Sequence, residues 1–171
     1  FIFCLFSQLS EPFMKPDFTQ IFSTAPEDYP KLLKIWEMAV RATHSFLNEQ
    51  HILQIRELII QYHYFDHVQL FHIAHNGTIV GFMGLAYEKI EMLFVDPQYF
   101  KLGIGSTLLD RALLLGMTEV DINEQNEGAL AFYQTRGFQE IARSEFDAEG
   151  NPFPILHLKV KVKVKVKVKV K

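Results

Sequence analysis

Residues 89–105, KIEMLFVDPQYFKLGIG, decide the fold of this chain. Residues 89–95 favour a strand, which must end at Asp96-Pro97 because proline donates no hydrogen bond to a neighbouring strand. Apolar residues then recur at helical spacing and predict a helix over residues 104–115. The order of strand, glycine-containing turn and helix favours an anion site, since the free N–H groups and the dipole of the helix N-terminus point at the turn.

Two glycines, Gly103 and Gly105, lie in this turn and suit a pyrophosphate group. Their spacing is neither the GxGxxG of dinucleotide-binding folds nor the Gly-Lys-Ser/Thr ending of a P-loop. The motif therefore gives no support to hydride transfer or to phosphoryl transfer. Glycine also serves any tight turn that needs left-handed backbone, so these residues alone leave both interpretations open.

Upstream of this stretch, the sequence contains three local signals for helix starts and turns. Thr24 and Glu27 have capping-box spacing ahead of a helix. Asn48 is expected to cap a second helix. Asn76-Gly77 indicates a hairpin between two strands, because both residues adopt the backbone of its tight turn readily.

Downstream, Asn126 is expected to cap the last helix, and Gly137 to end it in left-handed conformation with Phe138 folded back on the helix. The chain then alternates as β-α-α-β-β-β-α-β-α-β-β. The predicted strands cover residues 18–23, 68–74, 78–87, 89–95, 119–123, 139–146 and 154–158, and the predicted helices cover about 28–41, 49–62, 104–115 and 127–136.

The distribution of charge along the chain indicates which class of partner it can bind. The chain has 171 residues and a formal charge of -3, but seven lysines fall in residues 159–171. Up to Leu158 there are 10 positive against 20 negative residues, a balance of -10. An acidic body disfavours nucleic acid and suits a cationic amine acceptor. No apolar run approaches the roughly 20 residues that span a bilayer, so no membrane partner is expected.

The domain organisation is predicted to be simple. Residues 14–158 form a single domain, because 171 residues leave no room for a second core. Residues 1–13 are expected to be a non-native or flexible leader. The Lys-Val repeat of residues 159–171 is either an appended low-complexity tail or a binder of anionic lipid or nucleic acid.

The cysteine and histidine residues indicate the redox state of the compartment and whether a metal site is expected. Cys4 is the single cysteine and cannot form a disulfide within the chain, which favours the reducing cytoplasm. The seven histidines show no HExxH pattern, and ligands along an alternating strand would point to both faces. We expect no metal site.

Two motifs carry a resemblance to the GNAT superfamily of N-acetyltransferases. Residues 93–97 with Gly103-Ile104-Gly105 resemble its pyrophosphate-binding motif, and residues 126–133 with Gly137-Phe138 resemble its second signature. Residues 41–47, 123–127 and 143–145 are also similar to the YjaB-like subfamily of bacterial peptidyl-lysine or small-amine acetyltransferases.

The resemblance implies an α/β (α+β) fold with a mixed, mostly antiparallel sheet of about seven strands flanked by about four helices. It implies acetyl-CoA as cosubstrate and direct attack of a primary amine on the thioester. The strand ending at Val95 should open away from residues 119–123 to admit the pantetheine arm. The implied cofactor-binding residues are Leu93, Phe94, Val95, Lys101, Gly103, Ile104, Gly105 and Asn126.

The resemblance also suggests roles in catalysis. Tyr133 corresponds to the acid that protonates the leaving thiolate, although an aromatic residue at this spacing also suits a core. Glu91 is our candidate base through a water, or a solvated strand residue. His44 either lines the acceptor pocket or caps a helix end. Phe100 stands where the family usually has Gln or Arg, and Lys101 can supply the missing charge.

The leading hypothesis is thus an acetyl-CoA-dependent N-acetyltransferase acting on a peptidyl lysine or a small amine, as a monomer or homodimer. The alternative is a catalytically degenerate acyl-CoA-binding regulatory module, which the substitution at Phe100 motivates. Release of free CoA in the presence of an amine distinguishes the two hypotheses.

Overall fold

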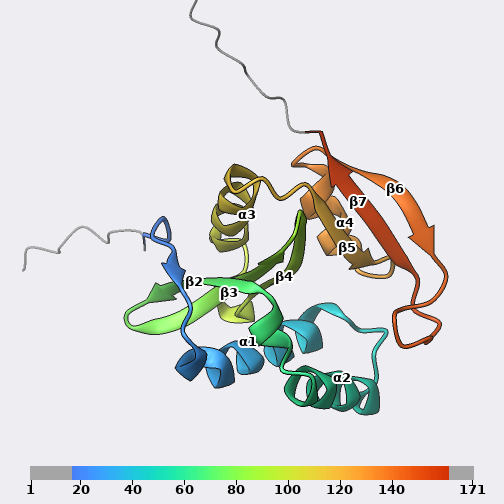
Figure 1. Ribbon diagram of the computed structural model, residues 1–171, viewed down its shortest axis with the longest axis horizontal. Helices are drawn as coiled ribbons and strands as arrows, with labels where there is room; N and C mark the ends of the chain where they lie inside the picture. The colour runs from blue at the N-terminus through green and yellow to red at the C-terminus, as the bar shows by residue number, and fades with distance from the viewer. Residues whose placement is uncertain (1–16, 162–171) are drawn as a thin grey trace, which may run out of the picture.

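The computed structural model describes residues 17–161, and the predicted leader of residues 1–13 lies outside them. The described part contains one seven-stranded sheet of order β1-β2-β3-β4-β5-β7-β6 (Figure 1). Every neighbouring pair is antiparallel except β4 and β5. The strands are β1 (Phe22–Ser23), β2 (Gln69–His75), β3 (Thr78–Ala86), β4 (Lys89–Val95), β5 (Glu119–Asn123), β6 (Phe138–Ser144) and β7 (Ile155–Val160).

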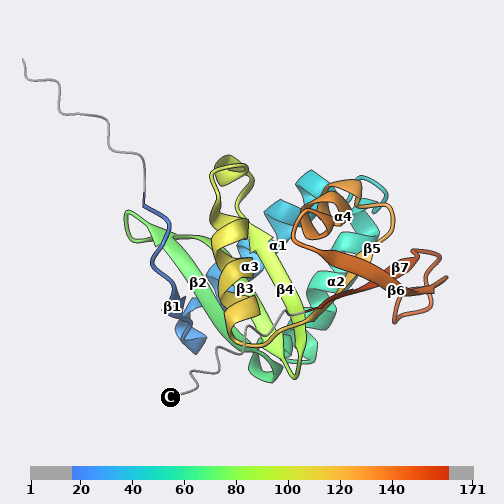
Figure 2. The same ribbon diagram turned by 90° about the horizontal axis from the view of Figure 1, so that it is seen from above.

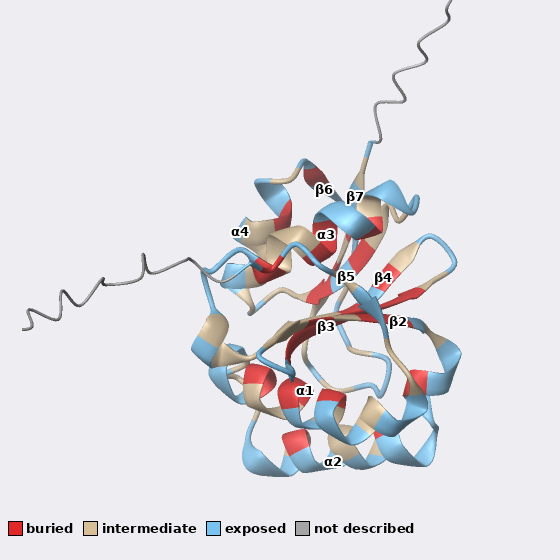
Figure 3. Ribbon diagram, turned by 90° about the vertical axis from the view of Figure 1, so that its left-hand side faces the viewer, coloured by how far each residue is buried: buried red, intermediate tan, exposed pale blue. Residues whose placement is uncertain are grey.

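Helices cover both faces of the sheet. In Figure 2, α3 crosses β3 and β4 on one side, while α1 and α2 lie behind them. One apolar core joins α3 and the neighbouring Tyr133 to the sheet, and a second joins α1 and α2 to the opposite face. Figure 3 shows the buried residues on the faces that meet. The helices are α1 (Tyr29–Thr43), α2 (Glu49–Gln61), α3 (Ile104–Leu114) and α4 (Glu127–Gln134).

Most of the predicted turns and caps are confirmed. Asn76 and Gly77 both have positive φ, at 50° and 76°, as a hairpin turn of this type requires. Asn48 caps α2, because its side chain accepts a hydrogen bond from the His51 N–H at 2.9 Å. Gly137 has φ of 87° and ends the α4 segment in left-handed conformation.

Three local predictions were wrong. Thr24 does not cap α1, because a 3₁₀ turn intervenes and the Thr24 hydroxyl instead contacts Nδ1 of His72 at 2.9 Å. The first strand was predicted over residues 18–23, but only Phe22 and Ser23 pair with β2. The last strand continues to Val160, so the start of the predicted tail pairs with its neighbours in the sheet. Residues 162–171 lie outside the described part.

The third of the sheet formed by β5, β7 and β6 has two unlike faces. Val120 and Ile122 are buried in the core with α3, whereas the alternate residues Glu119 and Asp121 point to the other face. That other face carries cross-strand pairs, among them Lys159 with Glu119 at 2.7 Å. The charged side chains of these three strands therefore gather on this face.

Candidate active site

The centre of the site is an opening between β4 and β5. These parallel strands pair only at Lys89 with Glu119 and at Ile90 with Val120. Beyond Ile90, the edge of β4 that faces β5 has no strand partner in the described residues. Backbone N–H and C=O groups need partners when they are buried, so this edge suits an extended ligand with amide groups of its own. The predicted opening at residues 92–95 is present.

A β-bulge at Glu91 coincides with the point where the strands separate. In the pairing of β4 with β3, Leu85 lies opposite Ile90 and Gly84 opposite Met92, so Glu91 is the extra residue. Successive residues of a regular strand face opposite sides, but a bulge breaks that alternation. As a result, Glu91 and Met92 both face the same cavity.

The glycine turn lies at the start of α3. Gly103 has φ of 92°, and a Cβ placed there would meet no atom within 4 Å. Glycine is thus required by the backbone conformation, and the space around it is open. The first intrahelical acceptor is the carbonyl of Gly103, bonded by Thr107 at 2.9 Å. The N–H groups that precede Thr107 in this first turn have no intrahelical partner and suit a phosphate.

The surroundings of this turn fit a diphosphate. Lys101 has φ of 63° and is exposed, so its ammonium can reach an anion at the turn. Phe100, at the position usually held by Gln or Arg, is 38% exposed. A Cβ at Gly105 would lie 3.6 Å from the Phe132 ring and 3.8 Å from Leu93, so a methyl group fits there at ordinary contact distance. The turn and the open strand edge together match an acyl thioester with a diphosphate.

Helix α4 closes the far side of the opening. Asn126 caps it, with its side-chain oxygen accepting the Ala129 N–H at 3.0 Å. Tyr133 is 5% exposed and packs edge-to-face on Phe138, with ring centroids 5.3 Å apart. Burial raises the pKa of the Tyr133 hydroxyl, which therefore keeps its proton. Tyr133 thus belongs to the core, and its neighbour Phe132 reaches the glycine turn.

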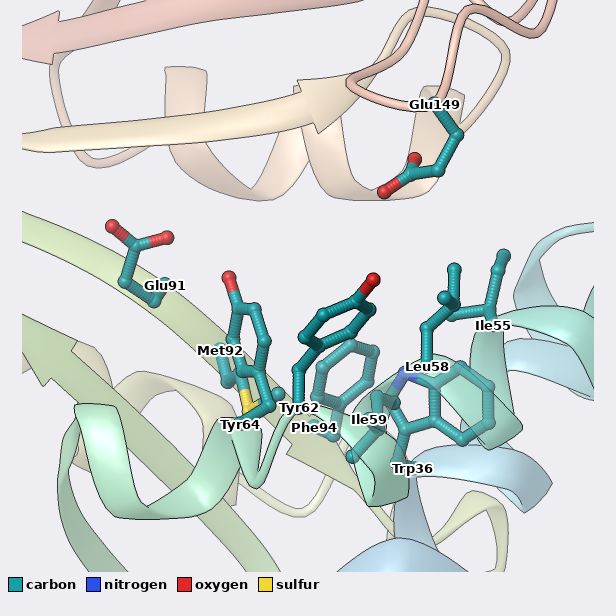
Figure 4. Close-up of a pocket in the computed structure, with 10 residues that line it drawn as sticks. All are labelled: Trp36, Ile55, Leu58, Ile59, Tyr62, Tyr64, Glu91, Met92, Phe94 and Glu149. Atoms are coloured by element: carbon teal, nitrogen blue, oxygen red, sulfur yellow. The ribbon is translucent and has the colours of Figure 1, made fainter.

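A cavity of about 500 Å³ lies on the opposite face of β4, between α1, α2 and the β6–β7 loop. Its floor is apolar and aromatic, and carboxylates from β4 and from the loop stand on opposite sides of it (Figure 4). The Tyr62 and Tyr64 hydroxyls point into the space between these carboxylates. The lining residues are Trp36, Ile55, Leu58, Ile59, Tyr62, Tyr64, Glu91, Met92, Phe94 and Glu149.

The electrostatics of this cavity favour a cation. Glu91 is exposed as a residue, yet neighbouring side chains remove enough water from its carboxyl to raise its pKa. Asp121 raises that pKa further, while Lys89 opposes the shift. Burial and the charges of Glu91 and Glu149 raise the pKa of Tyr64 as well. A positive group here would be attracted by two carboxylates.

A second hollow, of about 790 Å³, continues from this cavity along α2. Both hollows are lined by Ile55, Leu58 and Glu149. The loop that carries Glu149 is ordered by Asp147, whose side chain accepts hydrogen bonds from the Glu149 N–H at 3.1 Å and the Asn151 N–H at 2.7 Å. The loop therefore holds Glu149 at the junction of the two hollows.

His44 lies at the C-terminal end of α1, where its backbone N–H bonds to Val40. Its Nδ1 is 2.8 Å from the Thr43 hydroxyl, and its ring lies 5.4 Å from that of Phe46. Burial lowers the pKa of the imidazole. His44 is not among the residues that line either hollow. The structure thus brings Glu91 to the cavity, but not His44.

The other polar groups of the cavity were not predicted from the sequence. Tyr62 follows the end of α2, Tyr64 begins a 3₁₀ turn, and Glu149 lies in a loop. No short motif joins them. The one available signal was the clustering of aromatic residues at the predicted end of the second helix.

Residues 17–161 also bear on metal binding and on membrane insertion. No group of three or more His, Cys, Asp or Glu side chains in this range is placed to hold a metal ion. Within the same residues, none of the helices combines the length and apolar character needed to cross a membrane.

The comparisons with known proteins agree with this geometry. Residues 66–140 match the family described as Acetyltransferase (GNAT) domain. The peptidyl-lysine N-acetyltransferase YjaB of Salmonella typhimurium is 38% identical over 135 residues, which are 77% of this chain and 91% of that protein. The solution structure of apo YjaB from Escherichia coli has a TM-score of 0.74 at 33% identity, covering 82% of this chain and 95% of that one.

A more distant structure shares the fold alone. It is the PaiA N-acetyltransferase from Thermoplasma acidophilum in complex with coenzyme A, with a TM-score of 0.60 at 18% identity, covering 83% of this chain and 98% of that one. The alternative of a degenerate binding module finds no support in these matches. Motifs, fold and relatives agree, and the chain belongs to the GNAT family of N-acetyltransferases, which take their acetyl group from acetyl-CoA.

Proposed function

We propose that this N-acetyltransferase acetylates the side-chain amine of lysine within a peptide or protein. The observation that carries the proposal is the aromatic cavity with Glu91 and Glu149 on opposite sides, placed directly beside the opened strand edge. The name of the Salmonella relative, a peptidyl-lysine N-acetyltransferase, supports the same substrate class.

The shape of the cavity suits a lysine side chain. Its alkyl stem can lie along Trp36 and Phe94, because lysine buries its methylenes on apolar surface while its ammonium stays among polar groups. The ammonium would then sit between Glu91 and Glu149. The second hollow along α2 leaves room for the residues that flank the lysine, which a small free amine would not use.

The donor is held mainly by backbone. When bound, acetyl-CoA supplies a thioester whose carbonyl carbon the neutral amine attacks. Residues Leu93, Phe94 and Val95 would bond its pantetheine arm from the open edge of β4. The first turn of α3, with Gly103, Ile104 and Gly105, would bind the diphosphate, and Lys101 would add a positive charge.

Two proton transfers complete the proposed mechanism. Glu91 would take a proton from the lysine ammonium through a water, and its raised pKa makes the carboxylate a better base than an ordinary glutamate. The family resemblance gives the second transfer to Tyr133, whose hydroxyl is kept protonated by burial, and it would donate that proton to the departing sulfur. Asn126 would act on the donor through its position at the start of α4. His44 lines neither hollow and would act on the acceptor side only indirectly, because its ring packs on Phe46, which packs on Phe153 of the second hollow.

The setting of the reaction is also part of the proposal. A cytoplasmic location agrees with the single cysteine, and acetyl-CoA and protein lysines meet in that compartment. The protein acts as a monomer or homodimer.

The test compares acceptors at fixed acetyl-CoA. A peptide with one internal lysine and a blocked N-terminus should gain an acetyl group on Nε, with kcat/KM well above that of a free diamine. The matched control is the same peptide with arginine in place of lysine. Preferential transfer to the diamine, or to a free α-amine over Nε, would overturn the lysine assignment.

A further inference from the structure

Three side chains on the polar face of the sheet form a hydrogen-bond chain, and two of them, Ser144 and His157, have no part in the proposed acetyl transfer. The Ser144 hydroxyl lies 2.8 Å from Nε2 of His157, and Nδ1 of His157 lies 2.7 Å from a carboxylate oxygen of Asp121. The other oxygen of Asp121 accepts a hydrogen bond from Lys89 at 2.6 Å. The order is nucleophile, imidazole and carboxylate.

The hydrogen positions follow from the partners. A carboxylate only accepts hydrogen bonds, so Nδ1 of His157 must carry a hydrogen toward Asp121. In the neutral imidazole, Nε2 then presents a lone pair, and the Ser144 hydroxyl donates to it. The contact with Lys89 holds the Asp121 side chain in place. This is the arrangement in which an imidazole activates a serine hydroxyl.

A β-bulge is what places Ser144 on this face. Residues 138–140 of β6 pair in regular register with β7, but the register shifts between Glu140 and Ala142, which puts Ala142 opposite His157. A shift of one residue turns every later side chain to the other face. Ser144 therefore lies diagonally beside His157, while Asp121 lies directly opposite it on β5.

The site is accessible and has donors for a negative charge. Ser144 is half-buried, and the side chains of His157 and Asp121 are 31% and 34% exposed. Strand β6 is the outermost strand of the sheet, so its outward backbone N–H groups have no strand partner within residues 17–161. Such N–H groups stabilise the oxyanion that forms when a hydroxyl attacks a carbonyl.

We propose that Ser144, His157 and Asp121 form a second acyl-transfer centre, which accepts acyl groups from small activated esters and thioesters. Ser144 Oγ forms a bond to the acyl carbon, and the bond from that carbon to the leaving oxygen or sulfur breaks. His157 takes the Ser144 proton and passes it to the leaving group. Water then attacks the acyl-serine with His157 as base, which releases a carboxylic acid and restores the serine. Asp121 acts as a positioning residue.

The experiment mixes the full chain with p-nitrophenyl acetate and follows p-nitrophenolate. A rapid burst ahead of a slower steady rate is expected, with the acetyl group located on Ser144 by tandem mass spectrometry. Ser144→Ala should abolish the burst and the labelled peptide. The matched control Ser23→Ala, at an exposed serine on β1, should keep both.

Two further readouts separate this centre from a purely structural network. Asp121→Asn should slow acylation by roughly 10² to 10⁴, because an amide can donate to Nδ1 and favour the wrong tautomer. Ser144→Ala should keep lysine-peptide acetylation and the thermal unfolding midpoint, which shows that the variant is folded. The proposal is overturned if wild-type protein shows no acetyl-Ser144, or if Ser144→Ala is acylated as fast as wild type.

Discussion

The proposed donor side and the proposed acceptor side of this enzyme are built from different parts of the chain. The proposed donor side consists largely of backbone: the edge of β4 that has no strand partner among residues 17–161, and the first turn of α3 behind Gly103. The acceptor side consists of side chains from α1, α2, β4 and the β6–β7 loop. A backbone site tolerates side-chain changes such as Phe100, whereas a side-chain site changes its specificity with single substitutions. The following predictions test that contrast.

The largest effect is expected from Gly105→Glu. A glutamate at Gly105 brings a carboxylate into the first turn of α3, where its charge would repel the phosphates of the donor. Calorimetry should show no measurable acetyl-CoA binding. Gly105→Ala is the control, since its methyl group fits at ordinary contact distance, and it should bind normally. Equal binding by both variants would show that acetyl-CoA does not bind at this turn.

Tyr133→Phe should have the next largest effect. It keeps the ring and its contact with Phe138 and removes only the oxygen, so the thermal midpoint should change little. Loss of a general acid typically costs roughly 10² to 10⁴ in rate, and the loss should appear in kcat while acetyl-CoA affinity is kept. Tyr87→Phe, at a residue that is 97% exposed, provides the control. A wild-type kcat would leave Tyr133 with its core role alone.

Glu91→Gln tests the base on the acceptor side. The pKa of Glu91 is raised above the ordinary 4.5, so its carboxylate is lost as pH falls through that higher value. In wild type, kcat/KM should decline on the acid side at a higher pH than an ordinary glutamate would give. The variant should be slower by a factor of roughly 10², and its kcat/KM should no longer show this decline at low pH. The control Glu88→Gln, outside the cavity, should keep the wild-type rate and the wild-type decline of kcat/KM at low pH. If Glu91→Gln has an unchanged pH profile, another group is the base.

The smallest effect is expected from Glu149→Gln. An exposed carboxylate contributes little to an ion pair, so KM for a lysine peptide should rise only about two- to five-fold with kcat unchanged. The difference from wild type should shrink as salt rises, because charges are screened over about 10 Å at 0.1 M. Glu140→Gln on β6 should leave KM as it is. An equal rise in both variants would point to overall charge, with no specific role for the loop.

The same contrast explains what the sequence could predict. Strand β4, strand β5 and the start of α3 were predicted at the bounds that the structure shows, because each is defined by local signals such as Asp96-Pro97 and Gly103. A site made of backbone groups depends on short stretches of sequence, so a sequence motif was enough to propose where the donor binds. The functional roles of the residues in these stretches remain predictions.

Apart from Glu91, the proposed acceptor side could not be predicted, because it depends on register and long-range contact. Glu91 and Met92 share the cavity only through a bulge. The proposed second centre was missed for the same reason, since Ser144 meets His157 only through another bulge. A bulge depends on pairing between strands and leaves no clear mark in a single strand's sequence. Asp121 and His157 are 36 residues apart, and no local pattern joins them.

The most direct test of this division is a titration of the protein with acetyl-CoA, followed by backbone amide NMR. The account predicts that the amide signals of residues 91–95 and 103–106 shift with saturation, while those of Tyr62 and Glu149 stay in place until a lysine peptide is added. Shifts that are confined to Tyr62, Tyr64 and Glu149 on addition of acetyl-CoA, with none at residues 103–106, would contradict it.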